Sequence, residues 1–379
     1  MNHLSRTIVL VSGGPIIGGK EIVSLTLAKG LRSAGFKPIW FVSSWLGEGV
    51  FIARLRKEGI EFCRMRLGFI SISLSLKPIW WTIDQLRYWP ALLAAYRMNI
   101  GRVAPSVVIH CNWHHALLLS PLLDPSRDIY WSHEIFPNNG RYRWVFRQIS
   151  RRVARIVCVS HAAARSLATL GVPRERICVI HNGTQFDVDM PPAAVGPQLR
   201  LGIAGQIGPW KGHDDLVDAV AQLNDRGVNV TLKIFGNGQP DYIESLKAKI
   251  RSRGIDNHVE WCGFVADPAQ IFGAIDVCVV PTRSEEPFAT SALEASLARR
   301  AVIAAAVGGL PEIVQDFETG FLVEPGNADQ IATAIERFVR RPELVVTMGE
   351  AAHRRAAAHF TGARFTEDFI KLIEEIAAA

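Results

Sequence analysis

The 379 residues exceed what one hydrophobic core usually organises, so two domains of roughly 150–200 residues are expected. No stretch offers the ~20 uninterrupted apolar residues of a membrane-spanning helix, and no RNA- or DNA-binding motif is present, so neither a spanning helix nor a nucleic-acid partner is expected. Residues 1–195 carry a net charge of +13 and the remainder −7, which indicates different ligands for the two halves.

Short β-branched runs alternate with helical stretches along the chain, a pattern typical of parallel sheets. In the first half the expected strands are 7–12, 37–43, 60–66, 107–111, 128–132, 155–160 and 177–181. In the second half they are 199–204, 229–235, 259–264, 276–281, 301–305 and 320–324. Helical periodicity fills the gaps, for example at 213–226 and 241–252. The pattern predicts an α/β fold of two doubly wound parallel-sheet (Rossmann-like) domains that face a central cleft.

The boundary between the domains is predicted from a stretch rich in proline and glycine, 184–198, which has the composition of a linker. We expect an N-terminal domain over 1–190 and a C-terminal domain over 199–360. Beyond residue 340 the sequence is rich in alanine and arginine and has helical character. These helices are expected to close the second domain, and a helix over 361–379 can return to the first.

The loop after the first strand is rich in glycine and includes Gly18 and Gly19. It is neither a P-loop nor a dinucleotide fingerprint. Its glycines would let a ligand phosphate approach the backbone, although turn formation alone explains them equally well. His133 follows the strand 128–132, which places it at the carboxyl edge of the sheet. There it can hydrogen-bond a sugar hydroxyl or carry a proton.

The second domain opens with a strand, a loop and a helix that begins with acidic residues. The loop contains Gly205, Gln206 and Lys211. Glycine allows close approach of a diphosphate, and a lysine supplies a compact positive charge to its oxygens. A surface lysine on an ordinary strand-to-helix loop is the alternative interpretation.

Two glutamates eight residues apart, Glu286 and Glu294, follow the strand 276–281. Glu286 lies on the loop before a predicted helix, and Glu294 lies about one turn inside it. Loops at the carboxyl ends of parallel strands line the ligand crevice, and the helix start offers N–H groups to a phosphate. A capping box of Ser291 with Glu294 competes as an explanation for the second glutamate.

In these motifs the chain resembles the retaining, nucleotide-sugar-dependent glycosyltransferases of family four, which have the two-domain GT-B fold. The resemblance extends over nearly the whole chain. It is carried most specifically by the glutamate pair and by Val307-Gly308-Gly309-Leu310-Pro311-Glu312-Ile313-Val314. The glycine loops, His133, 179–183, 236–238, 263–265 and 320–323 also match in order.

The resemblance implies roles for these residues. The first domain would bind the acceptor and the second the nucleotide-sugar, with Glu286 at the donor sugar and Glu294 at the ribose. Lys211 and the N–H groups of Phe288, Ala289 and Thr290 would hold the diphosphate, which Gly19 would meet from across the cleft. Phe264 and Val265 would lie by the base, and His133 would touch the donor sugar. Such enzymes retain the anomeric configuration without a metal, because lysine and helix N–H groups stabilise the leaving diphosphate.

Two positions depart from the family pattern. Gln206 stands where the family usually has arginine, so a charge is missing from the phosphate loop, and Ala289 stands where glycine is common. The departures leave open a slow enzyme, an unusual donor or a non-catalytic relative.

The expected function is transfer of a hexose-type sugar from a nucleoside diphosphate sugar to a polysaccharide or lipid-linked saccharide acceptor, with no further cofactor. No metal is expected, since His110, His114 and His115 are interpreted as partly buried polar residues. The alternatives are a silent sugar-nucleotide-binding scaffold of a glycan-assembly complex, and a two-domain epimerase or phosphorylase. The expected location is the cytoplasm. The aromatic run 80–97 is either a surface that meets an anionic membrane at its inner face or a buried helix.

Overall fold

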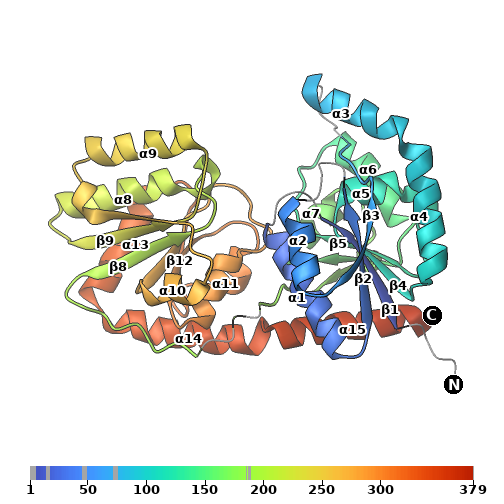
Figure 1. The fold of residues 1–379 in the computed structure, drawn as a ribbon. Coiled ribbons are helices and arrows are strands. Elements are labelled where there is room, and N and C mark those ends of the chain that lie inside the picture. The colour runs from blue at the N-terminus through green and yellow to red at the C-terminus, as the bar shows by residue number, and fades with distance from the viewer. Residues whose placement is uncertain are drawn as a thin grey trace. The chain divides into compact units, whose positions relative to one another are not determined.

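The computed structural model describes residues 6–13, 18–44, 49–70, 76–184, 186 and 189–378, with the backbone alone at 76–78. The chain divides into two compact units, Met1–Gly183 with Gly362–Ala379, and Thr184–Thr361. Each unit is built on one parallel sheet with helices on both faces (Figure 1). The predicted fold class, two parallel-sheet α/β domains, is confirmed.

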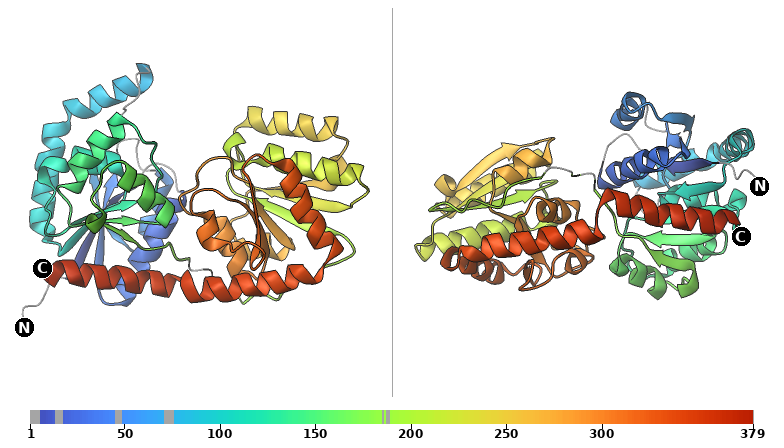
Figure 2. Two further views of the ribbon diagram at one scale, coloured as in Figure 1. Left: turned by 180° about the vertical axis from the view of Figure 1, so that it is seen from behind. Right: turned by 90° about the horizontal axis from the view of Figure 1, so that it is seen from below.

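The first unit contains a seven-stranded sheet in the order β3-β2-β1-β4-β5-β6-β7. Its strands are β1 (Thr7–Ser12), β2 (Lys37–Ser43), β3 (Glu61–Met65), β4 (Val107–His110), β5 (Asp128–Ser132), β6 (Arg155–Cys158) and β7 (Ile177–Val179). Its helices are α1 (Gly19–Ser33), α2 (Gly49–Lys57), α3 (Leu76–Arg87), α4 (Trp89–Val103), α5 (Trp113–Leu118), α6 (Gly140–Ser150), α7 (His161–Thr169) and α15 (Gly362–Ala378). In this unit α15 packs beside α1 and against β5, where Trp131 contacts Phe365 and Phe369 (Figure 2).

The second unit contains a six-stranded sheet in the order β10-β9-β8-β11-β12-β13. Its strands are β8 (Leu199–Ala204), β9 (Val230–Phe235), β10 (Val259–Gly263), β11 (Val277–Val280), β12 (Ala301–Ala305) and β13 (Gly320–Val323). Its helices are α8 (His213–Asp225), α9 (Pro240–Ser252), α10 (Pro268–Gly273), α11 (Thr290–Leu297), α12 (Leu310–Ile313), α13 (Ala328–Arg340) and α14 (Glu343–His359).

The strand order reverses beside the first strand of each sheet. In the first unit β1 lies between β2 and β4, and in the second unit β8 lies between β9 and β11. Ligands of open α/β sheets bind at such a reversal, outside the carboxyl ends of the strands. The reversal in the second unit brings together the loop after β8, which carries Lys211, and the loop after β11, which carries Glu286.

The aromatic run at 80–97 is divided between two helices, α3 and α4. In α4 the side chains of Leu92 and Tyr96 are buried, and Trp89 donates a hydrogen bond to the Leu118 carbonyl at 2.7 Å. In α3, by contrast, Trp80 is 68% exposed and Ile83 is 51% exposed. The buried-helix interpretation therefore holds for α4, whereas α3 presents apolar side chains to solvent.

The stretch predicted to be a linker, 184–198, belongs to the second unit. Met190 and Ala193 are buried, and Arg299 and Arg300 donate hydrogen bonds to the carbonyls of Met190 and Pro191 at 2.8 and 2.9 Å. Proline and glycine end the regular structure here, but the two arginines hold the irregular segment against α11 and β12. Among the described helices, none has the length and hydropathy that crossing a bilayer requires.

Candidate active site

The loop between β8 and α8 positions Lys211. It passes Gly205, forms a short 3-10 turn at Pro209–Lys211 and enters α8 through Gly212, whose φ of +74° is left-handed. A Cβ atom at Gly212 would collide with the carbonyl of Pro281 at the end of β11. Glycine is required at 212 because of the left-handed backbone and because of this close approach. The close approach holds Lys211 beside the loop that leaves β11.

The loop between β11 and α11 is bonded to the Lys211 loop at its start. The Trp210 carbonyl accepts hydrogen bonds from the Arg283 N–H at 2.8 Å and from the Thr282 hydroxyl at 3.0 Å. The Arg283 guanidinium also binds both carboxylate oxygens of buried Asp215, at 2.7 and 2.5 Å. These contacts fix the backbone of the two loops relative to each other.

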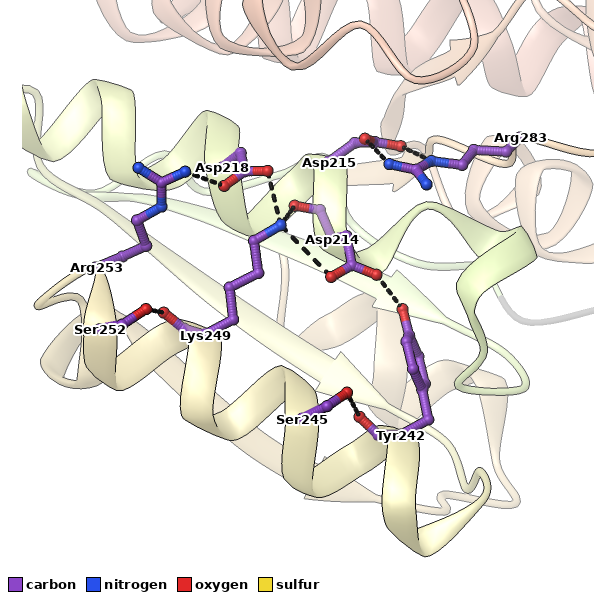
Figure 3. Close-up of polar contacts among 9 residues, drawn as sticks. All are labelled: Asp214, Asp215, Asp218, Tyr242, Ser245, Lys249, Ser252, Arg253 and Arg283. Carbon is purple, nitrogen blue, oxygen red and sulfur yellow. Dashed lines mark hydrogen bonds and ion pairs between the residues drawn. The ribbon is translucent and has the colours of Figure 1, made fainter.

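Figure 3 shows the contact of Arg283 with Asp215 together with the neighbouring polar contacts of α8 and α9. Tyr242 donates a hydrogen bond to Asp214 at 2.6 Å, and Lys249 pairs with Asp218 at 2.7 Å. Burial and the hydrogen bond to Asp214 raise the pKa of the Tyr242 hydroxyl above its usual value. The acidic start of α8, read from the sequence only as a helix signal, thus anchors α9 and the loop after β11.

The Gly-Gly motif at 308–309 supports the backbone of Glu286. The Gly309 N–H donates a hydrogen bond to the Glu286 carbonyl at 2.8 Å. Gly308 has a φ of +56°, and a Cβ atom there would collide with the same carbonyl oxygen. The motif that was the most specific signal in the sequence therefore has a structural task, which is to hold the glutamate loop in place.

Lys211 and Glu286 are brought into direct contact. The Lys211 Nζ atom lies 2.9 Å from Oε1 and 2.6 Å from Oε2 of Glu286. The Lys211 side chain is 26% exposed and the Glu286 side chain 20% exposed, so the pair is accessible but partly shielded from water. A cation and a carboxylate thus lie together at the carboxyl edge of the sheet, beside the start of α11.

Helix α11 begins at Thr290 with Ala289 as its N-cap, and no side chain caps it. Ser291 is therefore inside the helix, and the capping-box interpretation of Glu294 is wrong. The N–H groups of the first turn point out of the helix end and are available to a phosphate. Burial raises the pKa of the Glu294 carboxyl to about 7, so near neutral pH it can both donate and accept hydrogen bonds.

A small pocket in the second unit gathers several of the predicted residues. It is lined by the ends of β8 and β11 and by Gly205, Gln206, Lys211, His213 and Ser291. Phe264 and Val265 follow β10 at the same edge of the sheet, with Phe264 70% exposed.

His213 also lines this pocket, but sequence analysis did not single it out. Its position directly after Lys211 and Gly212 was the signal that could have identified it. Burial lowers its pKa to about 4, so its imidazole is neutral at pH 7.

Gly18, Gly19 and His133 belong to the first unit. Gly18 is the N-cap of α1, and its N–H donates a hydrogen bond to Glu21 at 3.0 Å. The His133 ring lies 4.2 Å from that of Trp131, and its Nε2 atom is buried without a hydrogen-bond partner among the described residues. Burial and the charge of Lys20 hold the pKa of His133 well below its usual range. Lys20, between the glycines and Glu21, is a second residue that sequence analysis missed.

Comparisons with known proteins agree on the family. The model of the family "Glycosyltransferase Family 4" matches residues 17–188, and that of "Glycosyl transferases group 1" matches residues 193–355. The chain is 35% identical over 229 residues to the D-inositol 3-phosphate glycosyltransferase of Streptomyces griseus, an alignment that covers 51% of this chain and 48% of the relative. The chain thus spans about half the length of that relative. A Jonesia denitrificans protein of the same name is 26% identical over 84% of this chain and 77% of its own.

A solved structure with the same fold is HepE from Anabaena. Its complex with UDP superposes with a TM-score of 0.83 and 21% identity, over 97% of this chain and 100% of HepE. HepE has also been solved with UDP-glucose.

Proposed function

Because this chain belongs to the family-four glycosyltransferases with the GT-B fold, we propose that it transfers a hexose-type sugar from a nucleoside diphosphate sugar to a saccharide or lipid-linked saccharide acceptor. The proposed transfer retains the anomeric configuration and uses no metal. The observation that carries the proposal is the contact of Lys211 with Glu286 at the uncapped start of α11. The site combines a cation and helix N–H groups, which would bind a diphosphate, with a carboxylate, which would bind the donor sugar.

The chemistry required of the site is cleavage of the bond between the anomeric carbon and the diphosphate. Lys211 and the N–H groups of Phe288, Ala289 and Thr290 stabilise the charge that grows on the departing diphosphate. Glu286 accepts hydrogen bonds from the donor sugar, and Glu294 binds the ribose hydroxyls. The interactions of Lys211 and the N–H groups stabilise the leaving diphosphate, as a bound metal cation does in other enzymes.

On the acceptor side, a neutral His133 donates or accepts one hydrogen bond with a sugar hydroxyl. Burial and the charge of Lys20 support this role, since both disfavour a charged imidazole. Gly19 supports a ligand at the start of α1, since a Cβ atom there would meet no neighbour within 4 Å among the described residues, whereas one at Gly18 would lie 3.3 Å from the Glu21 carboxylate.

A uridine diphosphate sugar is the first donor to test, because HepE has been solved with UDP and with UDP-glucose. A panel of UDP-, GDP- and ADP-sugars would be incubated with the protein, and release of nucleoside diphosphate would be measured. We expect release from one donor and none from Glu286→Ala protein. Identical release by both proteins would show that the catalytic assignment is wrong.

The competing function is a silent sugar-nucleotide-binding scaffold, which Gln206 favours because it brings no charge to the phosphate loop. The same panel separates the two functions, since a scaffold binds a nucleotide but releases none from the donor. Acceptors should include D-inositol 3-phosphate, because the Streptomyces griseus and Jonesia denitrificans relatives are named for it.

A lipid-linked acceptor implies that the protein works at the inner face of a membrane. The exposed apolar side chains of α3 support this, as does the basic charge of the first half of the chain. The protein should sediment with anionic liposomes at low salt and lose binding at high salt. Replacing Trp80 with alanine should weaken the binding, whereas the control Phe317→Ala, at an exposed aromatic residue of the second unit, should not. Partition between buffer and anionic liposomes that is equal with and without salt would count against membrane contact.

A further inference from the structure

The contact between Lys211 and Glu286 sets a condition on how a diphosphate can bind. Both oxygens of the carboxylate face the same ammonium group, at 2.9 and 2.6 Å. A lysine ammonium has three donors and one charge, and a carboxylate that binds it through both oxygens offsets that charge. A diphosphate that uses Lys211 must therefore compete with Glu286.

Hydrogen bonds between the two loops favour a change in the side chains over a separation of the loops. Trp210, one residue before the lysine, is bonded through its carbonyl to Thr282 and Arg283 at the start of the glutamate loop. At its other end, the Glu286 carbonyl is held by the Gly309 N–H. With the backbone fixed on both sides, the change open to the pair is rotation of its side chains.

We propose that the Glu286 carboxylate is an internal competitor of the nucleoside diphosphate for Lys211. When the diphosphate binds, the Lys211 ammonium moves from the carboxylate to a phosphate oxygen, and the carboxylate becomes free to accept hydrogen bonds from the donor sugar. When the sugar has been transferred, the carboxylate recaptures the lysine and promotes departure of the nucleoside diphosphate. The inference rests on the proposed function, because it assigns the exchange to the same donor site.

The exchange predicts an unusual gain of affinity on removing a residue of the site. Glu286→Gln keeps the shape of the side chain but removes the charge that holds Lys211. We expect it to bind UDP up to about fivefold more tightly than the wild type in calorimetry, although its transfer activity is lost. Glu286→Ala serves as a second variant, and thermal unfolding shows whether each variant is folded.

A matched control is provided by Glu285, an exposed neighbour on the same loop. Glu285→Gln changes the net charge by the same amount and should leave UDP affinity unchanged. The gain from Glu286→Gln should also largely disappear in a Lys211→Met background, since there is no longer a lysine to release.

The possible results separate the exchange from the proposed function. If the wild type binds UDP but Glu286→Gln binds it no more tightly, the exchange is wrong and the donor site stands. Equal gains from Glu285→Gln, or a gain that persists without Lys211, would show simple charge repulsion and also overturn the exchange. If the wild type binds none of UDP, GDP or ADP, the proposed function fails, and the exchange fails with it.

Discussion

The two units share one order over six strands, to which the first unit adds β7, but they differ in how their polar residues are satisfied at the carboxyl edge of the sheet. In the second unit the charges are paired, Lys211 with Glu286 and Arg283 with Asp215. In the first unit His133 and His115 are neutral, because burial holds their pKa values well below the usual range. The same backbone thus supports two chemistries. In the proposed function, the Lys211 ammonium binds the diphosphate once it is released from Glu286, whereas the uncharged imidazole of His133 binds a hydroxyl group.

A large loss of activity is expected from removing the cation of the second unit. Lys211→Ala should lower the rate of nucleoside diphosphate release by roughly 10²–10³-fold, since a positioned donor to the leaving group is lost. The control is Lys247→Ala, because that ammonium pairs with exposed Glu244 away from the site. Loss of similar size in both variants would contradict the role of Lys211 at the leaving diphosphate.

A smaller loss of activity is expected when the support of Glu286 is disturbed without changing any charge. Gly308→Ala places a methyl group against the Glu286 carbonyl and should lower the release rate about a hundredfold by displacing the carboxylate. Gly254→Ala is the matched control, with a φ of +66° and no atom near the new Cβ. Both variants carry the strain of a left-handed alanine, so the difference between their rates isolates the contact. Equal rates would contradict the supporting role of the motif.

The protonation of Glu294 should appear in the pH dependence of stability. Its pKa of about 7 in the folded protein lies above the ordinary value of 4.5, so the folded state binds more protons than the unfolded state between these values. The free energy of unfolding should therefore fall as pH rises from 5 to 8, by about 2 kcal/mol from this residue. Urea unfolding of Glu294→Gln should lack that part of the decrease, whereas Glu285→Gln should retain it. Equal pH dependence of the wild type and Glu294→Gln would contradict the assignment.

The strands could be predicted to within one or two residues, because each is a short β-branched run bounded by glycine, proline or polar residues. The fold class followed from their alternation with helices. The contact of Lys211 with Glu286 could not be derived in this way, since the two residues are 75 positions apart and meet only through the pairing of β8 with β11.

Local sequence signals were wrong at one place and incomplete at another. Ser291 and Glu294 have the spacing of a capping box, but α11 starts earlier and leaves its first N–H groups uncapped. The composition of 184–198 predicts an interdomain linker, and the boundary between the units lies at its start, but composition does not reveal that Arg299 and Arg300, more than 100 residues later, bind its carbonyls. Along 184–198, distant residues thus help to determine the local arrangement.

The smallest effect is expected in the first unit, at His133. His133→Ala removes a neutral imidazole, so the transfer rate should fall about tenfold, the value of one uncharged hydrogen bond. UDP affinity should stay unchanged, because no charge in the second unit is altered. Measuring the rate at saturating donor and the UDP dissociation constant by calorimetry separates these quantities. A loss of UDP affinity with an unchanged saturated rate would place His133 with the nucleotide, and the division of chemistry between the two units would then be wrong.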